Sequence, residues 1–160
     1  LRKDENSALE LEKVTSIKVK YDFIEIMNVS LLEKAKIGSS GDKGSLRYAM
    51  LRCAGLLYSS GIAMDKLMQD KKNSDLLKKL STDLLSILTK AQIKFNDKEL
   101  NQKNFDAGYL KNFSEMDYFL KRYTWRLQTN FTTSLSLIKK DPFMQNETNI
   151  CLGIHDQLYG

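Results

Sequence analysis

The chain has 160 residues, of which 42% are hydrophobic and 28% are charged, and its formal net charge at pH 7 is +5. This length favours a single domain, residues 1–160, and the hydrophobic fraction excludes a disordered chain. Two cysteines exclude a disulfide-dense mini-protein and any four-cysteine zinc site. The basic residues are spread along the chain rather than gathered on one stripe, which argues against a nucleic-acid partner.

The first third of the chain predicts one long helix followed by a loop. Residues 17–23 also alternate as a strand would, but no other segment alternates, so a strand there would lack a partner. The stretch 37–45 is rich in glycine and serine and therefore predicts a flexible loop. It lacks the spacing of a phosphate-binding loop, which argues against nucleotide binding there. The heptad positions that favour the helix are Val14, Ile17, Tyr21, Ile24, Asn28 and Leu31.

The second predicted helix carries the most regular apolar pattern in the sequence. Ser45 is its expected N-cap, and Gly61 either allows a close helix crossing or marks a bend. Residues 48–64 are the most apolar stretch, but Arg52 interrupts them, so we expect no membrane-spanning segment. The heptad seam consists of Leu46, Met50, Cys53, Leu57, Ser60, Met64 and Leu67.

Three further helices follow. The third is expected to start after a break at residues 71–73, with Asn73 or Ser74 as its cap, and to end near Phe95. A polar connection over 96–107 precedes a fourth helix that begins at a capping-box-like sequence, Ser114 to Asp117. Asp141 and Pro142 predict the start of a final helix that runs to about residue 158. The expected fold is therefore all-α: an antiparallel helical bundle of four long helices plus a short C-terminal helix.

Aromatic and basic residues interleave along the fourth predicted helix. Core packing accounts for part of this pattern, and stacking on single-stranded nucleic acid is a further reading. Side chains that fall off the apolar stripe form a candidate protein interface, because an exposed aromatic face more often meets a protein than a nucleic acid. The candidate interface residues are Tyr118, Arg122, Tyr123, Trp125 and Arg126.

The two cysteines, Cys53 and Cys151, bear on both chemistry and compartment. They could be reduced core residues, or they could form one disulfide that closes a loop of about 100 residues. Cys151 and His155 lie four residues apart on one helical face, the spacing of a nucleophile with its base or of two zinc ligands, but no further ligands are apparent. We therefore predict no catalytic, metal or cofactor site, and a disulfide would favour export.

Part of the sequence resembles a known pattern. The run 47–58 (RYAMLRCAGLLY), followed downstream by Asp141-Pro142 and by Cys151, is similar to small uncharacterised exported helical proteins of marine bacteria and their phages. The resemblance covers about a quarter of the chain. It implies that Cys53 pairs with Cys151, and it brings no activity and no other site residue.

These observations predict a non-enzymatic, exported helical protein that acts as an interaction or structural subunit, either with a protein partner or by self-assembly. Export here means a periplasmic or extracellular location, and the start at Leu1 leaves open whether a leader was removed. One alternative is a secreted four-helix signalling ligand of the cytokine type, since four glycosylation sequons are present, at Asn28, Asn112, Asn130 and Asn146. The other alternative is a small-molecule or metal binder with its site in the bundle core.

Overall fold

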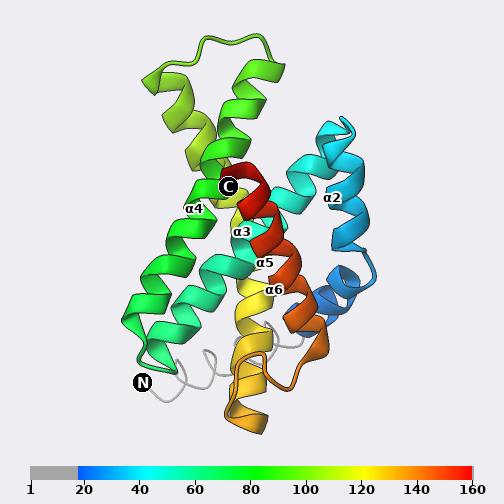
Figure 1. Ribbon diagram of the computed structural model, residues 1–160, viewed down its shortest axis with the longest axis vertical. Helices are drawn as coiled ribbons and strands as arrows, with labels where there is room; N and C mark the ends of the chain where they lie inside the picture. The colour runs from blue at the N-terminus through cyan, green and yellow to red at the C-terminus, as the bar shows by residue number, and fades with distance from the viewer. Residues whose placement is uncertain (1–17, 160) are drawn as a thin grey trace, which may run out of the picture.

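The computed structural model describes residues 18–159, which form helices and no strands (Figure 1). A helix covers residues 18–27, and the remaining helices are α2 (Leu31–Ser39), α3 (Lys43–Lys66), α4 (Lys71–Phe95), α5 (Gln102–Ser134) and α6 (Pro142–Tyr159). Successive helices from α2 to α6 reverse direction, and short connections join them. The all-α prediction is confirmed for these residues. The prediction of four long helices is not, because a break at residues 28–30 divides the first of them in two.

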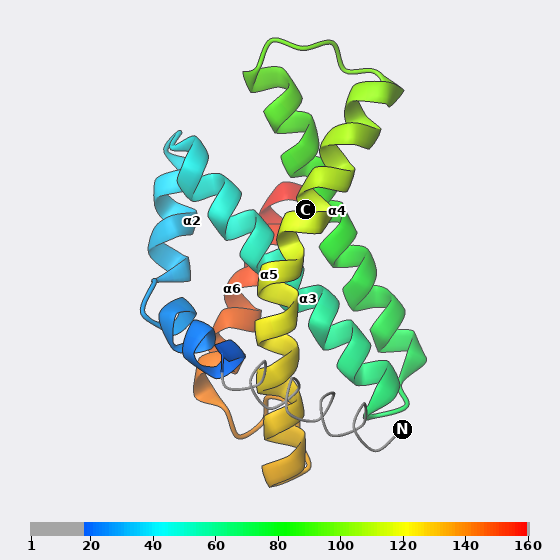
Figure 2. The ribbon, with the colours of Figure 1, turned by 180° about the vertical axis from the view of Figure 1, so that it is seen from behind.

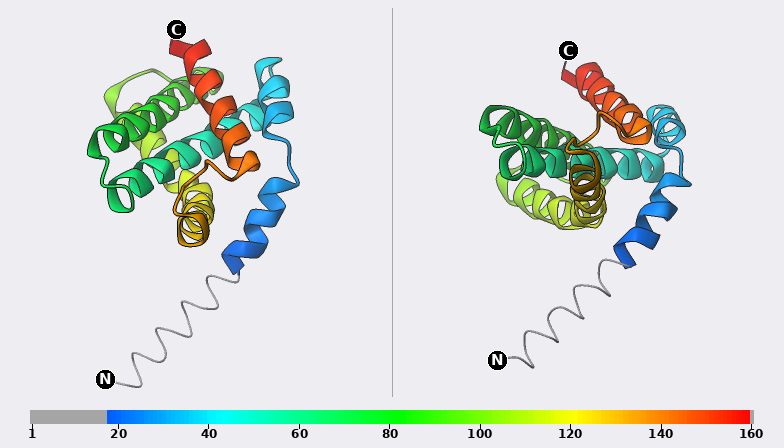
Figure 3. Two further views of the ribbon diagram at one scale, coloured as in Figure 1. Left: turned by 60° about the horizontal axis from the view of Figure 1, so that its bottom comes forward. Right: turned by 90° about the horizontal axis from the view of Figure 1, so that it is seen from below.

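Helix α3 lies at the centre of the structure rather than at one corner of a bundle. Helix α6 crosses one side of α3 and helix α5 crosses the opposite side, as the view from below in Figure 3 shows. Helices α4 and α2 flank α3 (Figures 1 and 2). All nine residues from 49 to 57 are buried, so this part of α3 has no solvent-facing side. The heptad seam was therefore too narrow a prediction, because a helix surrounded by four others is covered on every face.

Two glycines of α3 permit close crossings with α5 and α4. A methyl group added to Gly55 would lie 2.6 Å from Cβ of Phe119 on α5 and 2.9 Å from the backbone nitrogen of Leu120. A methyl group on Gly61 would lie 2.9 Å from the carbonyl oxygen of Ser74 on α4. Gly61 therefore serves a close crossing rather than a bend.

Three helices begin earlier than the hydrophobic pattern predicted. Asp42, not Ser45, caps α3, and Asp70, not Asn73 or Ser74, caps α4. Helix α5 begins at Gln102, so Ser114–Asp117 is not a helix start and the polar connection shrinks to residues 96–101. The first turns of these helices consist mainly of polar residues and carry no apolar stripe. The caps are identified instead by side-chain oxygens that accept from the backbone N–H three residues on, in the pairs Asp42–Ser45, Asp70–Asn73 and Asn101–Asn104.

The N-terminal heptad pattern also predicted the wrong buried face for the 18–27 helix. Phe23 and Ile26 are the buried residues of the 18–27 helix, whereas the heptad residues Tyr21 and Ile24 are 65% and 45% exposed. The predicted loop over 37–45 is mostly helical, since α2 extends to Ser39 and α3 starts at residue 43. The heptad positions at residues 14 and 17 lie outside the described residues. Two predicted boundaries are confirmed: α4 ends at residue 95, and α6 starts at Pro142.

Two glycine-to-alanine substitutions are expected to have opposite effects. Gly55→Ala should lower the free energy of unfolding by about 2–3 kcal/mol, because the added methyl meets the backbone of α5. Gly153→Ala, in the middle of α6, should raise it by about 0.5–1 kcal/mol, since nothing lies within 4 Å of the added atom and alanine has the higher helix propensity. Urea unfolding of both variants checks this pair, and a stability gain at residue 55 would contradict the described crossing.

Candidate functional site

The predicted interface on α5 is largely occupied by other parts of the same chain. Tyr123 is fully buried, so its assignment to an interface was wrong. Trp125 packs against Phe23 of the 18–27 helix, with ring centroids 5.9 Å apart. Only Tyr118 is substantially exposed, at 41%. This face of α5 therefore holds the 18–27 helix in place.

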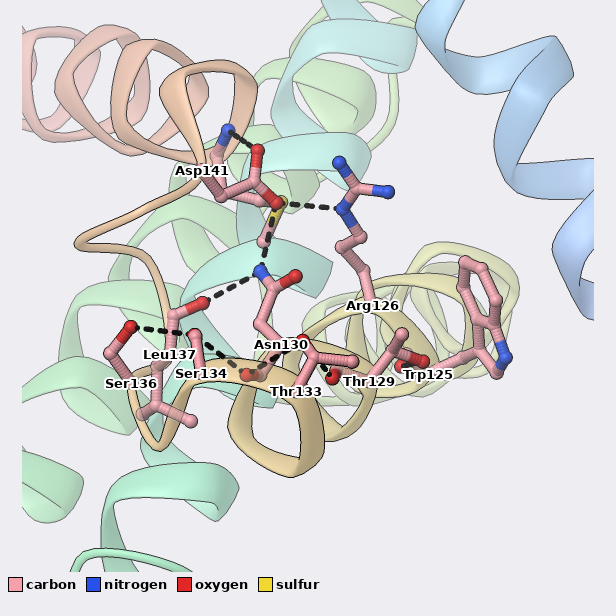
Figure 4. Close-up of polar contacts among 10 residues, drawn as sticks. Trp125, Arg126, Thr129, Asn130, Thr133, Ser134, Ser136, Leu137 and Asp141 are labelled. Carbon is pink, nitrogen blue, oxygen red and sulfur yellow. Dashed lines mark hydrogen bonds and ion pairs between the residues drawn. The ribbon is translucent and has the colours of Figure 1, made fainter.

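The two arginines of the predicted interface form ion pairs within the chain. Arg122 bonds to Asp22 of the 18–27 helix at 2.6 Å and lies over the ring of Tyr118, 3.9 Å from its centroid. Arg126 donates from Nε to Asp141 at 2.7 Å, just before α6 (Figure 4). Both arginine charges are therefore paired with carboxylates of the same chain, and these ion pairs link α5 to the 18–27 helix and to the residue before α6.

Asp141 joins the end of α5 to the start of α6 (Figure 4). Its carboxylate accepts hydrogen bonds from Arg126, from Asn130 Nδ2 at 2.8 Å and from the backbone N–H of Met144 at 3.2 Å. Asn130 Nδ2 also donates to the carbonyl oxygen of Leu137 at 2.8 Å. Partial burial by itself would raise the pKa of Asp141, but these hydrogen bonds outweigh it and lower the pKa below 3.8.

These contacts predict a loss of stability in acid. The pKa of Asp141 is lower in the folded than in the unfolded chain, so its stabilising effect is full above the unfolded value near 3.8 and disappears as the pH falls through the folded value. We expect Asp141→Asn, which keeps a capping side chain, to cost about 1 kcal/mol at pH 7, and we expect this cost to shrink as the pH falls below 3.8 and the carboxylate becomes protonated. Urea unfolding from pH 2 to 7 measures this difference, and a constant difference at every pH would contradict it.

A buried polar network that the sequence did not reveal crosses the core. Arg52 of α3 donates from Nε to the hydroxyl of Tyr123 at 2.8 Å, from Nη1 to the carbonyl oxygen of Val29 at 2.7 Å, and from Nη2 to Glu147 of α6. The hydroxyl of Tyr123 donates to Glu147 at 3.1 Å. The three residues are at most 3% exposed, so α3, α5, α6 and the connection before α2 meet at one buried ion pair. An arginine inside an otherwise apolar helical stretch was the only sequence signal.

Beside this network, Cys53 and Cys151 form a disulfide that joins α3 to α6. Their Cα atoms are 5.2 Å apart and both residues are fully buried. The pairing is therefore as expected, and it removes Cys151 from the Cys–His pair considered as a dyad or as zinc ligands. His155 instead bonds through Nε2 to Asp83 of α4 at 2.9 Å and stacks on Tyr159. This pair fastens the C-terminal turns of α6 to α4.

Two further observations bear on function. Among residues 18–159, no three histidine, cysteine, aspartate or glutamate residues come together as metal ligands. None of the helices in that range has an apolar stretch long enough to cross a membrane. Of the four sequon asparagines, Asn28 and Asn146 are exposed, whereas Asn112 is 1% exposed and Asn130 uses Nδ2 in two hydrogen bonds.

A groove of about 640 Å³ lies between α2 and α6, with α3 beneath it. Its apolar lining includes Leu32 on α2 and Leu158 on α6, each 46% exposed, and Ile154 between them. Gly153 also lines the groove, and an added Cβ there would meet nothing within 4 Å. The packing of the chain does not require glycine at this position, and its effect is to leave the groove deeper.

Comparison with known proteins adds no constraint on function. No family model matches the chain, and neither the curated proteins nor the solved structures give a match. The resemblance to exported helical proteins of marine bacteria and phages therefore stays a prediction.

Proposed function

We propose that this chain is a non-enzymatic, exported interaction subunit that binds an amphipathic helix of a protein partner in the α2–α6 groove. The groove carries the proposal. Two helices flank it and an apolar floor lies beneath, which is the arrangement in which an amphipathic helix buries its apolar face. Polar residues at its margin, among them Lys36, Asn149 and Gln157, suit the polar flanks of such a helix.

Gly153 supports the same conclusion from energetics. Glycine inside a helix is less stable than alanine by roughly 0.5–1 kcal/mol. At Gly55 and Gly61 this cost is offset by close packing, but at Gly153 the space is open. A glycine without a packing role that deepens an apolar groove is best explained by a ligand that approaches α6 closely.

The disulfide supports the exported location. Disulfides persist in oxidising compartments such as the periplasm and the extracellular space, whereas thiol reductants keep cysteines reduced in the cytosol. The bond between Cys53 and Cys151 closes a long loop in the core, where it contributes to the stability of the native state. The non-enzymatic part of the proposal is supported by the use of Cys151 in this bond, which leaves no thiol there to act as a nucleophile beside His155.

A display selection with helical peptides of 16 residues tests the proposal. Peptides selected on the native protein should place apolar residues at i, i+3, i+4 and i+7. Leu158→Glu, and separately Gly153→Leu, should weaken their binding by about tenfold or more, because one places a charge in the groove and the other fills it. Leu110→Glu is the matched control, since Leu110 is 70% exposed and lies outside the groove. Selected peptides that bind Leu158→Glu and Gly153→Leu as tightly as the native protein would refute the groove as the site.

Light scattering distinguishes the source of the helix. A native chain that dimerises, and that becomes monomeric in Leu158→Glu but not in Leu110→Glu, would show that the groove receives a second copy, as in a self-assembling subunit. Catalytic turnover of a substrate by the purified chain would refute the non-enzymatic assignment.

The cytokine-type alternative gains no specific support. The first of the four long helices that it requires is divided in this chain at residues 28–30. Asn112 is too buried to carry a glycan in the folded chain.

A further inference from the structure

A second, polar cleft lies where α4 ends and α5 begins, at the opposite end of the molecule from the last turns of α5. The last turns of α4 and the first turns of α5 diverge there, and the connection 96–101 joins them (Figures 1 and 2). Gly108 of α5 lies close to α4, because an added Cβ there would lie only 3.0 Å from Cγ2 of Thr89. Around this contact α4, α5 and their connection, together with Arg47 of α3, line a cleft of about 430 Å³, within the size range of small-molecule sites.

A hydrogen-bonded pair of amide side chains, Asn112 and Gln92, is part of the lining of the cleft. Asn112, which is 1% exposed, donates both protons of Nδ2 to α4: one to Oγ1 of Thr89 at 3.0 Å and one to Oε1 of Gln92 at 2.8 Å. These bonds leave Oδ1 of Asn112 as an acceptor and Nε2 of Gln92 as a donor, and neither atom has a hydrogen-bond partner within residues 18–159. Asn112 and Gln92 both line the cleft.

The walls of the cleft are positively charged. Arg47 and Glu115 form an ion pair at one end, which leaves the ammonium groups of Lys98 and Lys111 as the uncompensated charges of the lining. Neither lysine forms an ion pair within the described part of the chain. Two lysines with no carboxylate partner at one small cleft favour an anion.

We propose that this cleft binds a small hydroxylated anion, a sugar that carries a carboxylate or a phosphate group. The lysines compensate the anionic group. The acceptor on Asn112 and the donor on Gln92 bind hydroxyl groups, which both donate and accept hydrogen bonds. Ile93 and Ala107 line the remaining surface and contact the carbon skeleton. The site is independent of the α2–α6 groove, since no residue lines both.

Titration calorimetry of the full chain with glucuronate, glucose 6-phosphate, glucose and inorganic phosphate tests the proposal. At least one of the two sugar anions should bind about tenfold more tightly than glucose, which lacks the charge, and than inorganic phosphate, which lacks the hydroxyl groups. Comparison of glucuronate with glucose 6-phosphate identifies which anionic group the lysines prefer. Binding of inorganic phosphate as tight as that of both sugar anions would refute recognition of the hydroxyl groups.

Variants and a local probe separate this site from general attraction to a basic surface. Lys98→Gln and Lys111→Gln should each weaken binding by about fivefold to tenfold. Lys103→Gln, in the first turn of α5 and outside the lining, should change it less than twofold. In NMR spectra, the side-chain amide signals of Gln92 and Asn112 should shift on titration. Equal losses in all three lysine variants, or shifts confined to residues outside the cleft, would overturn the proposal.

Discussion

Replacing Glu147 by leucine is expected to lower the free energy of unfolding by about 3–5 kcal/mol. The substitution removes the carboxylate that faces Arg52 and the hydroxyl of Tyr123, while both of those groups stay buried. An arginine side chain that is 1% exposed cannot recover its lost partner from water. Urea unfolding at neutral pH, with the disulfide intact, measures the loss.

The protonation states of this network support a full charge on Arg52. Burial by itself would lower the pKa of Arg52, but the neighbouring Tyr123 and Glu147 raise it above its ordinary value. Burial raises the pKa of Tyr123, so its hydroxyl stays protonated and continues to donate to Glu147. Loss of Glu147 therefore leaves a cation in the core that cannot discharge.

Two controls separate this effect from a general cost of mutation. Glu115→Gln breaks the ion pair with Arg47, which is partly exposed, and should cost less than about 1 kcal/mol. The double variant Arg52→Met with Glu147→Leu should recover much of the stability lost in Glu147→Leu, because two apolar side chains need no partner. A loss in Glu147→Leu as small as that in Glu115→Gln would contradict the buried network.

Removal of the disulfide is the second large expected effect. Cys53→Ala with Cys151→Ala should lower the free energy of unfolding by about 4–5 kcal/mol in the chain-entropy description, because the cross-link closes a loop between residues 98 positions apart. Both cysteines are replaced together so that no free thiol remains to confuse the comparison. Urea unfolding of the oxidised protein and of the double variant measures the difference.

Intact mass after alkylation establishes the bond directly. In denatured, unreduced protein neither Cys53 nor Cys151 should take up an alkylating reagent, and both should react after reduction. Alkylation of both without reduction would contradict the disulfide and remove the support for an exported location.

The two effects are expected to be coupled. Arg52 and Cys53 are adjacent on α3, and Glu147 and Cys151 lie one turn apart on α6, so the two links join one turn of α3 to neighbouring turns of α6. Groups that share a contact surface seldom contribute additively. A double-mutant cycle between Glu147→Leu and the cysteine pair should show a coupling of about 1 kcal/mol or more, as each link positions the atoms of the other.

The success of the sequence predictions depended on how local the decisive interaction is. The start of α6 was predictable because Asp141 and Pro142 are adjacent and act on the helix they begin. The starts of α3 and α4 were missed because the apolar pattern begins only after the first turn. The break at residues 28–30 was missed for a different reason: the heptad pattern passes through it, whereas the carbonyl of Val29 is drawn to Arg52 across the core.

The same distinction holds for the candidate site. Sequence reasoning named Tyr118, Arg122 and Arg126 as part of a candidate interface with a protein partner, but it could not show that Asp22 and Asp141 of the same chain pair with the two arginines. It placed Cys53 and Cys151 as possible partners, because so few cysteines leave few pairings. It did not find the α2–α6 groove or the α4–α5 cleft, since each collects residues from separated helices.

By itself, the sequence determined the helical class, the end of α4, the start of α6 and the one possible disulfide, because these follow from local spacing and from counting. Only the tertiary structure decided that α3 is surrounded, that Arg52 has an ion-pair partner 95 residues away, and that Gly153 faces open space while Gly55 does not. The physical reason is that burial belongs to a position in space. A residue's neighbours along the chain limit its conformation, whereas the helices packed around it decide whether its charge is compensated and whether its surface is free to bind.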